Sequence, residues 1–435
     1  MWPLRETERK VGRTFANALA LMADYPEYLF AGPQAQQYAW CKEKHPSTYA
    51  AIGRAVAEGR WLPVGGAWVE ADGNLPGGEA LARQLVHGKR FFAQEFGVET
   101  RGVWLPDSFG YSAAYPQVAA LARNDWFLTQ KLSWNDTNAF PHHTFWWEGI
   151  DGTRMFTHFP PADTYNGEVS VEDLQRASRG FRDKGPATRS LYPFGHGDGG
   201  GGPVREMLER ARRVADLEGC PRVTIESPDA FFDAAKAEYA QEAPVWSGEL
   251  YLELHRGTLT SQARGKQGNR RSEHLLREAE LWAATAALAG TGAYDYPYDA
   301  LDHLWKRVLT LQFHDILPGS SIAWVHREAE AAYAEITAEL TALIEDAWRA
   351  VAGAPADPGP ATSYAVLNAG PHPRREVIAL PGSYGGAPAL VVAPAGGAGG
   401  PVTPAPASAS RSSATATSST STTACCRPGS AAVCW

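Results

Sequence analysis

The sequence predicts an α/β fold with a mainly parallel sheet, followed by a helical region and the start of a β region. Short apolar stretches alternate with helical stretches over the first half of the chain, and this repetition of strand, loop and helix is typical of parallel sheets. From about residue 270 to 352 the apolar residues recur at helical spacing instead. Hydrophobic residues make up 44% of the 435 residues, enough for a globular core.

The first predicted element is a helix over 4–24, where apolar residues recur every three or four positions. The predicted strands are Tyr28–Phe30, Gly102–Leu105, Trp126–Thr129, Ser190–Phe194 and Val223–Ile225. Helices are predicted near 33–45, 112–123, 204–215 and 228–240. One antiparallel hairpin, Thr144–Trp147 with Met155–Phe159, interrupts the alternation. The later helices are predicted over 272–290, 298–313 and 322–352.

Four regions follow from these elements. Residues 1–245 are the predicted α/β domain, and 246–355 are a helical domain expected to form a three-helix bundle. Residues 356–393 are the start of a β domain, and 394–435 are a tail. Up to residue 424 the tail is almost entirely Ala, Gly, Pro, Ser and Thr, so it has little to bury and should be disordered. Its abrupt start also fits out-of-frame translation, which is the interpretation we favour.

Composition excludes several classes of protein. The net charge of −8 argues against a nucleic-acid-binding face. No apolar stretch is long enough to cross a membrane, and the charged N-terminus lacks the apolar region of a signal peptide. The five cysteines do not make a disulfide scaffold, so a reducing, cytoplasmic compartment is expected. They include no Cys-x-x-Cys pair, which argues against a thiolate zinc site. The 15 Trp and 16 Tyr residues suit sugar stacking and a large core equally well.

The segment Trp104–Tyr111 places Asp107 just after a predicted parallel strand. Active sites of α/β folds lie at this end of their strands. A carboxylate there can act as a nucleophile, a base or a metal ligand. The alternative is a structural role as a helix N-cap, for which Asp and Ser are preferred.

The segment Phe194–Pro203 contains four consecutive glycines after His196 and Asp198. Glycines leave the backbone bare for close approach to a ligand. A phosphate cradle is one interpretation, although the Gly-Lys-Ser/Thr ending of a P-loop is missing. The others are an acid/base or ligand pair formed by His196 and Asp198, and a flexible linker.

Three further segments carry polar groups. Gln312–Ser321 holds His314 and Asp315 at a predicted helix end, where a histidine often only complements the helix dipole. Glu249–Gln262 is a predicted strand that ends in His255 and Arg256, which could bind hydroxyl groups or belong to an ordinary edge strand. Val64–Pro76 is a loop with Trp68, Glu70, Asp72 and Asn74, and its Asp-Gly-Asn also suits a turn.

Together these five segments resemble the glycoside hydrolase family 38 α-mannosidases, and they occur in the family's order over residues 1–380. The resemblance implies a β/α barrel that removes terminal α-linked mannose from mannose-containing oligosaccharides with retention. It implies one zinc ion (Zn2+) at the site and a covalent glycosyl-enzyme. Whether identical chains form a homo-oligomer is left open.

The resemblance also implies roles for individual residues. Asp107 is the expected nucleophile and a zinc ligand, His314 a second zinc ligand, and Asp198 the general acid/base. The residues expected to lie beside the sugar are Phe109, Tyr111, His196, His255, Arg256 and Asp315.

The chain departs from the family pattern at its start. The family has a His-x-Asp zinc motif immediately before the residues that match Trp2–Glu6, and this chain has none there. The resemblance therefore predicts a poorly soluble fragment, truncated at both ends, without the first barrel strand and with an incomplete ligand set. The alternatives are a catalytically inactive fragment, a carbohydrate-binding relic and, fitting less well, another metal-dependent hydrolase such as a sugar deacetylase.

Overall fold

A computed structural model describes residues 2–289, 294–352, 364–379, 388–393, 398–402 and 432–434. The chain divides into two compact units. The first comprises Met1–Arg270 and Trp305–Tyr333, and the second comprises Arg271–Leu304 and Ala334–Trp435. All the candidate site residues belong to the first unit.

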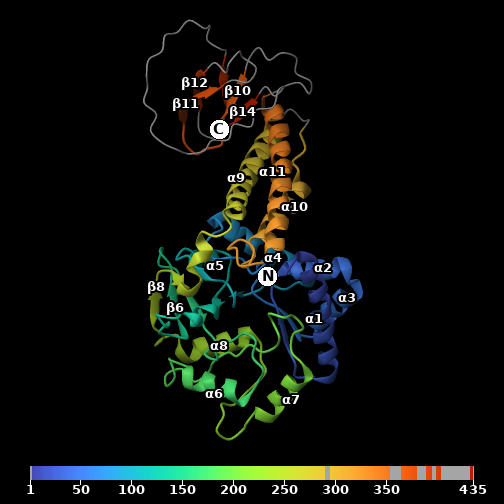
Figure 1. Ribbon diagram of the computed structural model, residues 1–435, viewed down its shortest axis with the longest axis vertical. Coiled ribbons are helices and arrows are strands. Elements are labelled where there is room, and N and C mark those ends of the chain that lie inside the picture. Colours follow the sequence, from blue (N-terminus) through green and yellow to red (C-terminus); the bar gives the residue numbers. More distant parts are fainter. Residues whose placement is uncertain are drawn as a thin grey trace. The chain divides into compact units, whose positions relative to one another are not determined.

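The main sheet of the first unit has five strands in the order β3-β5-β7-β6-β8. Its strands β6 and β8 are labelled in Figure 1. The bounds of the five strands are β3 Gly102–Trp104, β5 Trp126–Leu128, β6 Thr144–Glu148, β7 Arg154–His158 and β8 Val245–Ser247. Every pair is parallel except the hairpin of β6 and β7. The predicted α/β class is therefore confirmed, with a mixed sheet.

Two smaller pairs of strands complete the β structure described in this unit. β1 (Phe30–Gly32) is parallel to β2 (Trp61–Pro63), and β4 (Gly110–Tyr111) is antiparallel to β9 (Leu250–Tyr251). None of the described strands joins these pairs to the five-stranded sheet. The described strands thus form no closed sheet, and the barrel implied by the resemblance is not confirmed.

Helices flank these strands in the first unit, where α1, α2 and α3 lie together on the side away from β6 and β8 (Figure 1). They are α1 Leu4–Asp24, α2 Ala35–Lys44, α3 Pro46–Ala57, α4 Gly78–Phe96, α5 Tyr115–Leu121, α6 Val171–Gly180, α7 Arg205–Val214 and α8 Pro228–Tyr239. The structure adds α3, α4 and α6 to the helices that were predicted. No described helix is long and apolar enough to span a bilayer.

The three long helices predicted for the bundle are present as α9 Ala263–Leu288, α10 Tyr298–Leu311 and α11 Ala323–Ala352. Short strands follow in the second unit: β10 Tyr364–Leu367, β11 Arg374–Ala379, β12 Pro388–Ala393, β13 Ala398–Val402 and β14 Ala432–Cys434. Of the tail predicted over 394–435, only β13 and β14 are described. The rest of that prediction lies outside the described residues.

Two predicted strands are wrong. Ser190–Phe194 makes only one isolated bridge, between Phe194 and Gly167, and Val223–Ile225 forms no described strand. Local chemistry explains the first case. The backbone N–H of Leu191 donates to the side chain of His158 rather than to a neighbouring strand, and Pro193 has no N–H to donate.

An aromatic core fixes β3 and β5, the strands nearest the candidate site. Trp126 of β5 stacks on Phe232 of α8 with ring centroids 4.4 Å apart. A Cβ added to Gly102 of β3 would lie only 2.0–2.2 Å from atoms of the Trp126 ring. Only glycine lets the two strands pair across this ring, so Gly102 sets the position from which the chain enters the site.

Candidate active site

Asp107 lies three residues beyond the end of β3, at the carboxyl edge of parallel strands. Its loop is anchored by its neighbours. The Ser108 hydroxyl donates to the carbonyl of Ala71 at 2.8 Å, and the Tyr111 hydroxyl donates to the carbonyl of Leu105 at 2.6 Å. The next helix, α5, has Ala114 as its N-cap. The alternative interpretation of Asp107 as a helix cap is therefore wrong.

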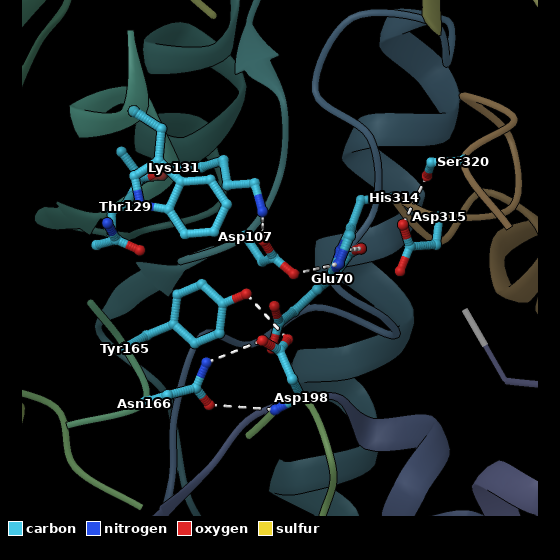
Figure 2. Close-up of polar contacts among 12 residues, drawn as sticks. Glu70, Asp107, Thr129, Lys131, Tyr165, Asn166, Asp198, His314, Asp315 and Ser320 are labelled. Atoms are coloured by element: carbon cyan, nitrogen blue, oxygen red, sulfur yellow. Dashed lines mark hydrogen bonds and ion pairs between the residues drawn. The ribbon is translucent and has the colours of Figure 1, made fainter. Parts of the chain in front are cut away.

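Two cationic side chains hold Asp107 from two sides (Figure 2). Lys131 Nζ lies 2.6 Å from Oδ1, and His314 Nε2 lies 3.3 Å from Oδ2. Burial alone would raise the pKa of Asp107, but the hydrogen bond and charge of His314 and the charge of Lys131 hold it well below its usual range. Asp107 is therefore ionised at neutral pH, as a nucleophile or a metal ligand requires.

His314 is oriented by the backbone of the Val64–Pro76 loop. Its backbone N–H and its Nδ1 both contact the carbonyl oxygen of Glu70, at 3.1 and 2.8 Å. A carbonyl accepts only from a protonated nitrogen, so Nδ1 carries a proton and Nε2 faces Asp107. Burial alone would lower the pKa of His314, but Asp107 outweighs burial and raises it to about 9.

The second carboxylate, Asp198, lies on the glycine-rich loop and is held by a pair of adjacent residues (Figure 2). The Tyr165 hydroxyl donates to Oδ1 at 3.0 Å, and Asn166 Nδ2 donates to Oδ2 at 2.9 Å. Burial raises the pKa of Tyr165, and the negative charges of Asp107 and Asp198 raise it further. The Tyr165 hydroxyl is thus bonded to Asp198 and lies within the electrostatic influence of Asp107.

The remaining predicted residues divide into two groups. Phe109 contacts the rings of His255 and His314, with centroids 4.6 and 5.9 Å apart, so these three side chains are brought together. Asp315 follows His314 and accepts a hydrogen bond from Ser320 Oγ at 2.6 Å. His196 is exposed, and its backbone pairs with that of Gly202.

The side chains of Tyr111 and Arg256 do not reach the site. Tyr111 has no exposed surface, and its hydroxyl is used by Leu105 and Thr129. Arg256 is exposed, and its Nε donates to the carbonyl of Glu253 one turn earlier.

A cavity of about 1350 Å³ opens within the first unit. Its lining includes Asp107, Asp198, His314, Asp315 and His196. Both carboxylates are therefore accessible from one space, which is far larger than a single sugar ring needs.

Comparison with known proteins assigns this constellation to a family. Residues 1–249 match the family described as glycosyl hydrolases family 38 N-terminal domain, and residues 253–351 match the alpha mannosidase middle domain. The chain belongs to glycosyl hydrolase family 38.

Individual relatives agree with the family 38 assignment. Alpha-mannosidase 2C1 of Homo sapiens is 45% identical over 392 residues, which is 90% of this chain and 37% of that protein. An alpha-mannosidase of Saccharomyces cerevisiae is 41% identical over 355 residues, 79% of this chain and 33% of that protein. The chain thus spans about a third of the length of these relatives. The matches do not favour the alternative of a non-catalytic relic.

The family 38 fold is supported independently by a solved structure, an alpha-mannosidase from Enterococcus faecalis V583. It superposes with a TM-score of 0.74 at 22% identity, covering 87% of this chain and 44% of that one. At this level of identity the likeness establishes the fold alone.

Zinc, which membership of family 38 implies, does not fit the described residues as a complete site. Asp107 and His314 supply a carboxylate and a correctly oriented imidazole, whose other nitrogen is held by a carbonyl as metal ligands usually are. In the described part of the chain, however, no three His, Cys, Asp or Glu residues gather as a metal site. Zinc sites normally use three or four protein ligands.

Sequence reasoning missed four residues of this family 38 site. Lys131 comes three residues after β5, so its place beyond a parallel strand was a usable signal. Glu70 was noted only as part of a loop; burial raises its pKa to about 7, and it lines the cavity. Tyr165 and Asn166 lie in an irregular stretch where no periodicity could reveal them.

Proposed function

We propose that this chain carries the catalytic site of a retaining α-mannosidase that hydrolyses terminal α-linked mannose from mannose-containing oligosaccharides. The observation that supports it best is that two carboxylates, Asp107 and Asp198, line the same cavity. Two carboxyl groups at one site are what glycoside hydrolysis with a covalent intermediate requires.

Asp107 is the proposed nucleophile. An ionised Oδ of Asp107 attacks the anomeric carbon while the bond to the leaving oxygen breaks, which forms a glycosyl-enzyme ester. Lys131 and His314 keep the attacking carboxylate ionised and fix its direction. They also balance its charge, so that burial does not favour a protonated, unreactive form.

Asp198 is the proposed general acid/base. It gives its proton to the leaving oxygen in the first step, and it takes a proton from the attacking water in the second. Tyr165 and Asn166 each donate to one of its oxygens, so the carboxyl group is held in one orientation at the cavity.

Sugar contacts follow from the remaining groups. The rings of Phe109 and His255 lie 4.6 Å apart and are tilted by 44°, beside His314, and aromatic groups of this kind suit the apolar side of a sugar ring. His196 and Asp315 line the cavity and could accept or donate to hydroxyl groups. For Tyr111 and Arg256 the proposed contact is supported by the resemblance alone.

Three finer points stay predictions: the barrel, the cytoplasmic location and the zinc ion. For zinc, Asp107 and His314 would be two of the ligands, and no catalytic step above depends on the metal. Metal analysis of the purified chain after dialysis measures the zinc content directly.

Covalent labelling tests the proposed function. A 5-fluoro-α-mannosyl fluoride should add one fluoromannosyl group to the peptide that contains Asp107, and Asp107→Asn should abolish both the label and the turnover of aryl α-mannosides. Asp136→Asn, at an exposed carboxylate outside the site, is the matched control and should leave both unchanged. An unlabelled chain that binds mannose without turnover would overturn the proposal.

A further inference from the structure

We propose that one polar face of helix α1 clamps the glycine-rich loop and thereby positions Asp198. The clamp consists of Lys10, Thr14 and Asn17, and the loop is residues 196–203. The inference rests on the proposed role of Asp198 as the acid/base. The three clamp residues are positioning residues, because none of them contacts Asp198 by side chain in any recorded interaction.

The clamp makes a continuous set of contacts with the loop backbone. Lys10 Nζ donates to the carbonyl of Gly199 at 2.8 Å, and the Gly201 N–H donates to Thr14 Oγ1 at 2.7 Å. Asn17 Nδ2 donates to the carbonyls of Gly201 and Pro203, at 2.7 and 3.0 Å. The clamp residues are four and three positions apart, so they share one face of the helix.

The loop needs such a partner because its own chain is poorly constrained. Gly200, Gly201 and Gly202 have φ angles of +66°, +122° and +67°, a region in which glycine is free and other residues are strained. Ordering glycine costs more conformational entropy than ordering any other residue. Within the loop, the recorded backbone bonds are the His196–Gly202 pair and the turn from Gly200 to Gly197.

Helix α1 is a rigid support for this purpose. The adjacent face of this helix is buried through Val11, Phe15, Ala18 and Met22. The loop is also held from the other side, where Asn166 Oδ1 accepts from the N–H groups of Gly197 and Asp198 at 2.7 and 3.2 Å. The backbone on either side of Asp198 is thus held by the clamp residues of α1 and by Asn166.

Hydrogen exchange on the full chain, without substrate, tests the clamp itself. Thr14→Val removes the acceptor of the Gly201 N–H with little change in shape, while Thr14→Ser keeps it. We expect amide exchange in the 196–203 peptide to become at least about tenfold faster in Thr14→Val and to stay unchanged in Thr14→Ser. Equal exchange in both variants, with matched melting temperatures, would overturn the clamp.

Leaving-group dependence tests the consequence for Asp198. A 2,4-dinitrophenyl α-mannoside needs no acid assistance, whereas a 4-methylphenyl α-mannoside does. In Thr14→Val and Asn17→Leu we expect kcat/KM to fall about tenfold on the poor leaving group and less than about twofold on the good one. The control is Arg9→Ala, on the same helix but paired with Glu6. An equal fall on both substrates would mean a merely structural role and would overturn the positioning.

The two measurements separate the inference from the proposed function. If the wild-type chain hydrolyses neither mannoside, the proposed function fails, and with it the role of Asp198. The exchange experiment still decides whether α1 orders the loop.

Discussion

Lys131 is the residue whose removal should affect the site most directly after the carboxylates themselves. Its side chain is 8% exposed, and its ammonium lies against Asp107 and over the Trp134 ring at 3.8 Å. Replacing it by Met would leave His314 as the remaining cation on Asp107.

We therefore expect Lys131→Met to lower kcat/KM for aryl α-mannosides by about 100-fold, because losing a close charge pair typically costs 2–5 kcal/mol. Lys131→Arg keeps the charge and should retain more of the activity. Steady-state kinetics of both variants make the comparison. Equal activity of the Met and Arg variants would show that the cation does not act on Asp107.

Tyr165 offers a second test at this scale, since its hydroxyl donates a hydrogen bond to Asp198. Tyr165→Phe should lower kcat about tenfold, in line with the loss of one hydrogen bond to a charged group. Tyr239→Phe, at a buried tyrosine on α8, is the control and should leave kcat unchanged. Unaltered kcat in Tyr165→Phe would show that the hydrogen bond to Asp198 does not contribute to turnover.

At the residue scale, position along a strand made Asp107 a candidate from the sequence, and the resemblance added its role and that of His314. The resemblance also brought the two residues together, as ligands of one zinc ion. Their local sequence patterns alone could not, because the position of the His314 ring depends on the distant Glu70 carbonyl. Tyr111 has the opposite outcome. It belongs to a chemically suggestive segment, yet the fold uses its hydroxyl to anchor a loop.

At the scale of elements, the pairing of β3 with β5 depends on residue 102 having no side chain. Gly102→Ala would place a methyl group inside the Trp126 ring. We expect it to lower the free energy of unfolding by about 3 kcal/mol, at the upper end of overpacking effects. Gly53→Ala in α3 has open space around the new methyl group and should raise stability by about 0.5–1 kcal/mol. Urea denaturation of both variants decides the matter.

Strand β7 contains a pH-sensitive contact. Leu191 N–H donates to His158 Nε2, so Nδ1 carries the proton and bonds Thr144. Burial lowers the pKa of His158 to about 3, well below 6.5. The folded state therefore binds fewer protons than the unfolded state below pH 6.5. Above pH 6.5 this histidine does not lower the free energy of unfolding. As pH falls from 6.5 toward the folded pKa, the unfolded state binds the proton first and the free energy of unfolding decreases.

We expect the free energy of unfolding to fall by roughly 1 kcal/mol per pH unit between pH 6 and 4 on account of this histidine. His158→Gln removes the titrating group and should flatten the slope by that amount. His142→Gln serves as the control, because His142 is a partly exposed histidine that contacts Asp183. Urea titrations at several pH values measure the slopes, and identical slopes in all three proteins would contradict the assignment.

Elements whose sequence pattern was strong were predicted close to their observed bounds, as α1, α8 and the β6–β7 hairpin show. The segment around Leu191 failed because a distant side chain takes the backbone donor that a strand would use. No local pattern contains that information. β1 was predicted two residues too early, as Tyr28–Phe30, and β2 was not predicted, because strands of three residues carry little alternation.

For the molecule as a whole, three uninterrupted helices cross the division between the two units. The boundaries fall inside α9, α10 and α11. Unfolding one unit must therefore fray helices that continue into the other, and helix formation is cooperative. We expect one calorimetric transition in which the calorimetric and van't Hoff enthalpies agree. Two resolved transitions would show that the units unfold independently.

The glycine-rich loop has a consequence for how this protein can evolve. Exposed loops usually tolerate substitution, and residues 199–202 are exposed or half-buried. Yet three consecutive positive φ angles exclude most side chains there, whatever room surrounds them. A saturation-mutagenesis map should therefore show a narrow intolerant band on an otherwise permissive surface. Descendants of this protein would keep these glycines long after its other exposed loops had diverged.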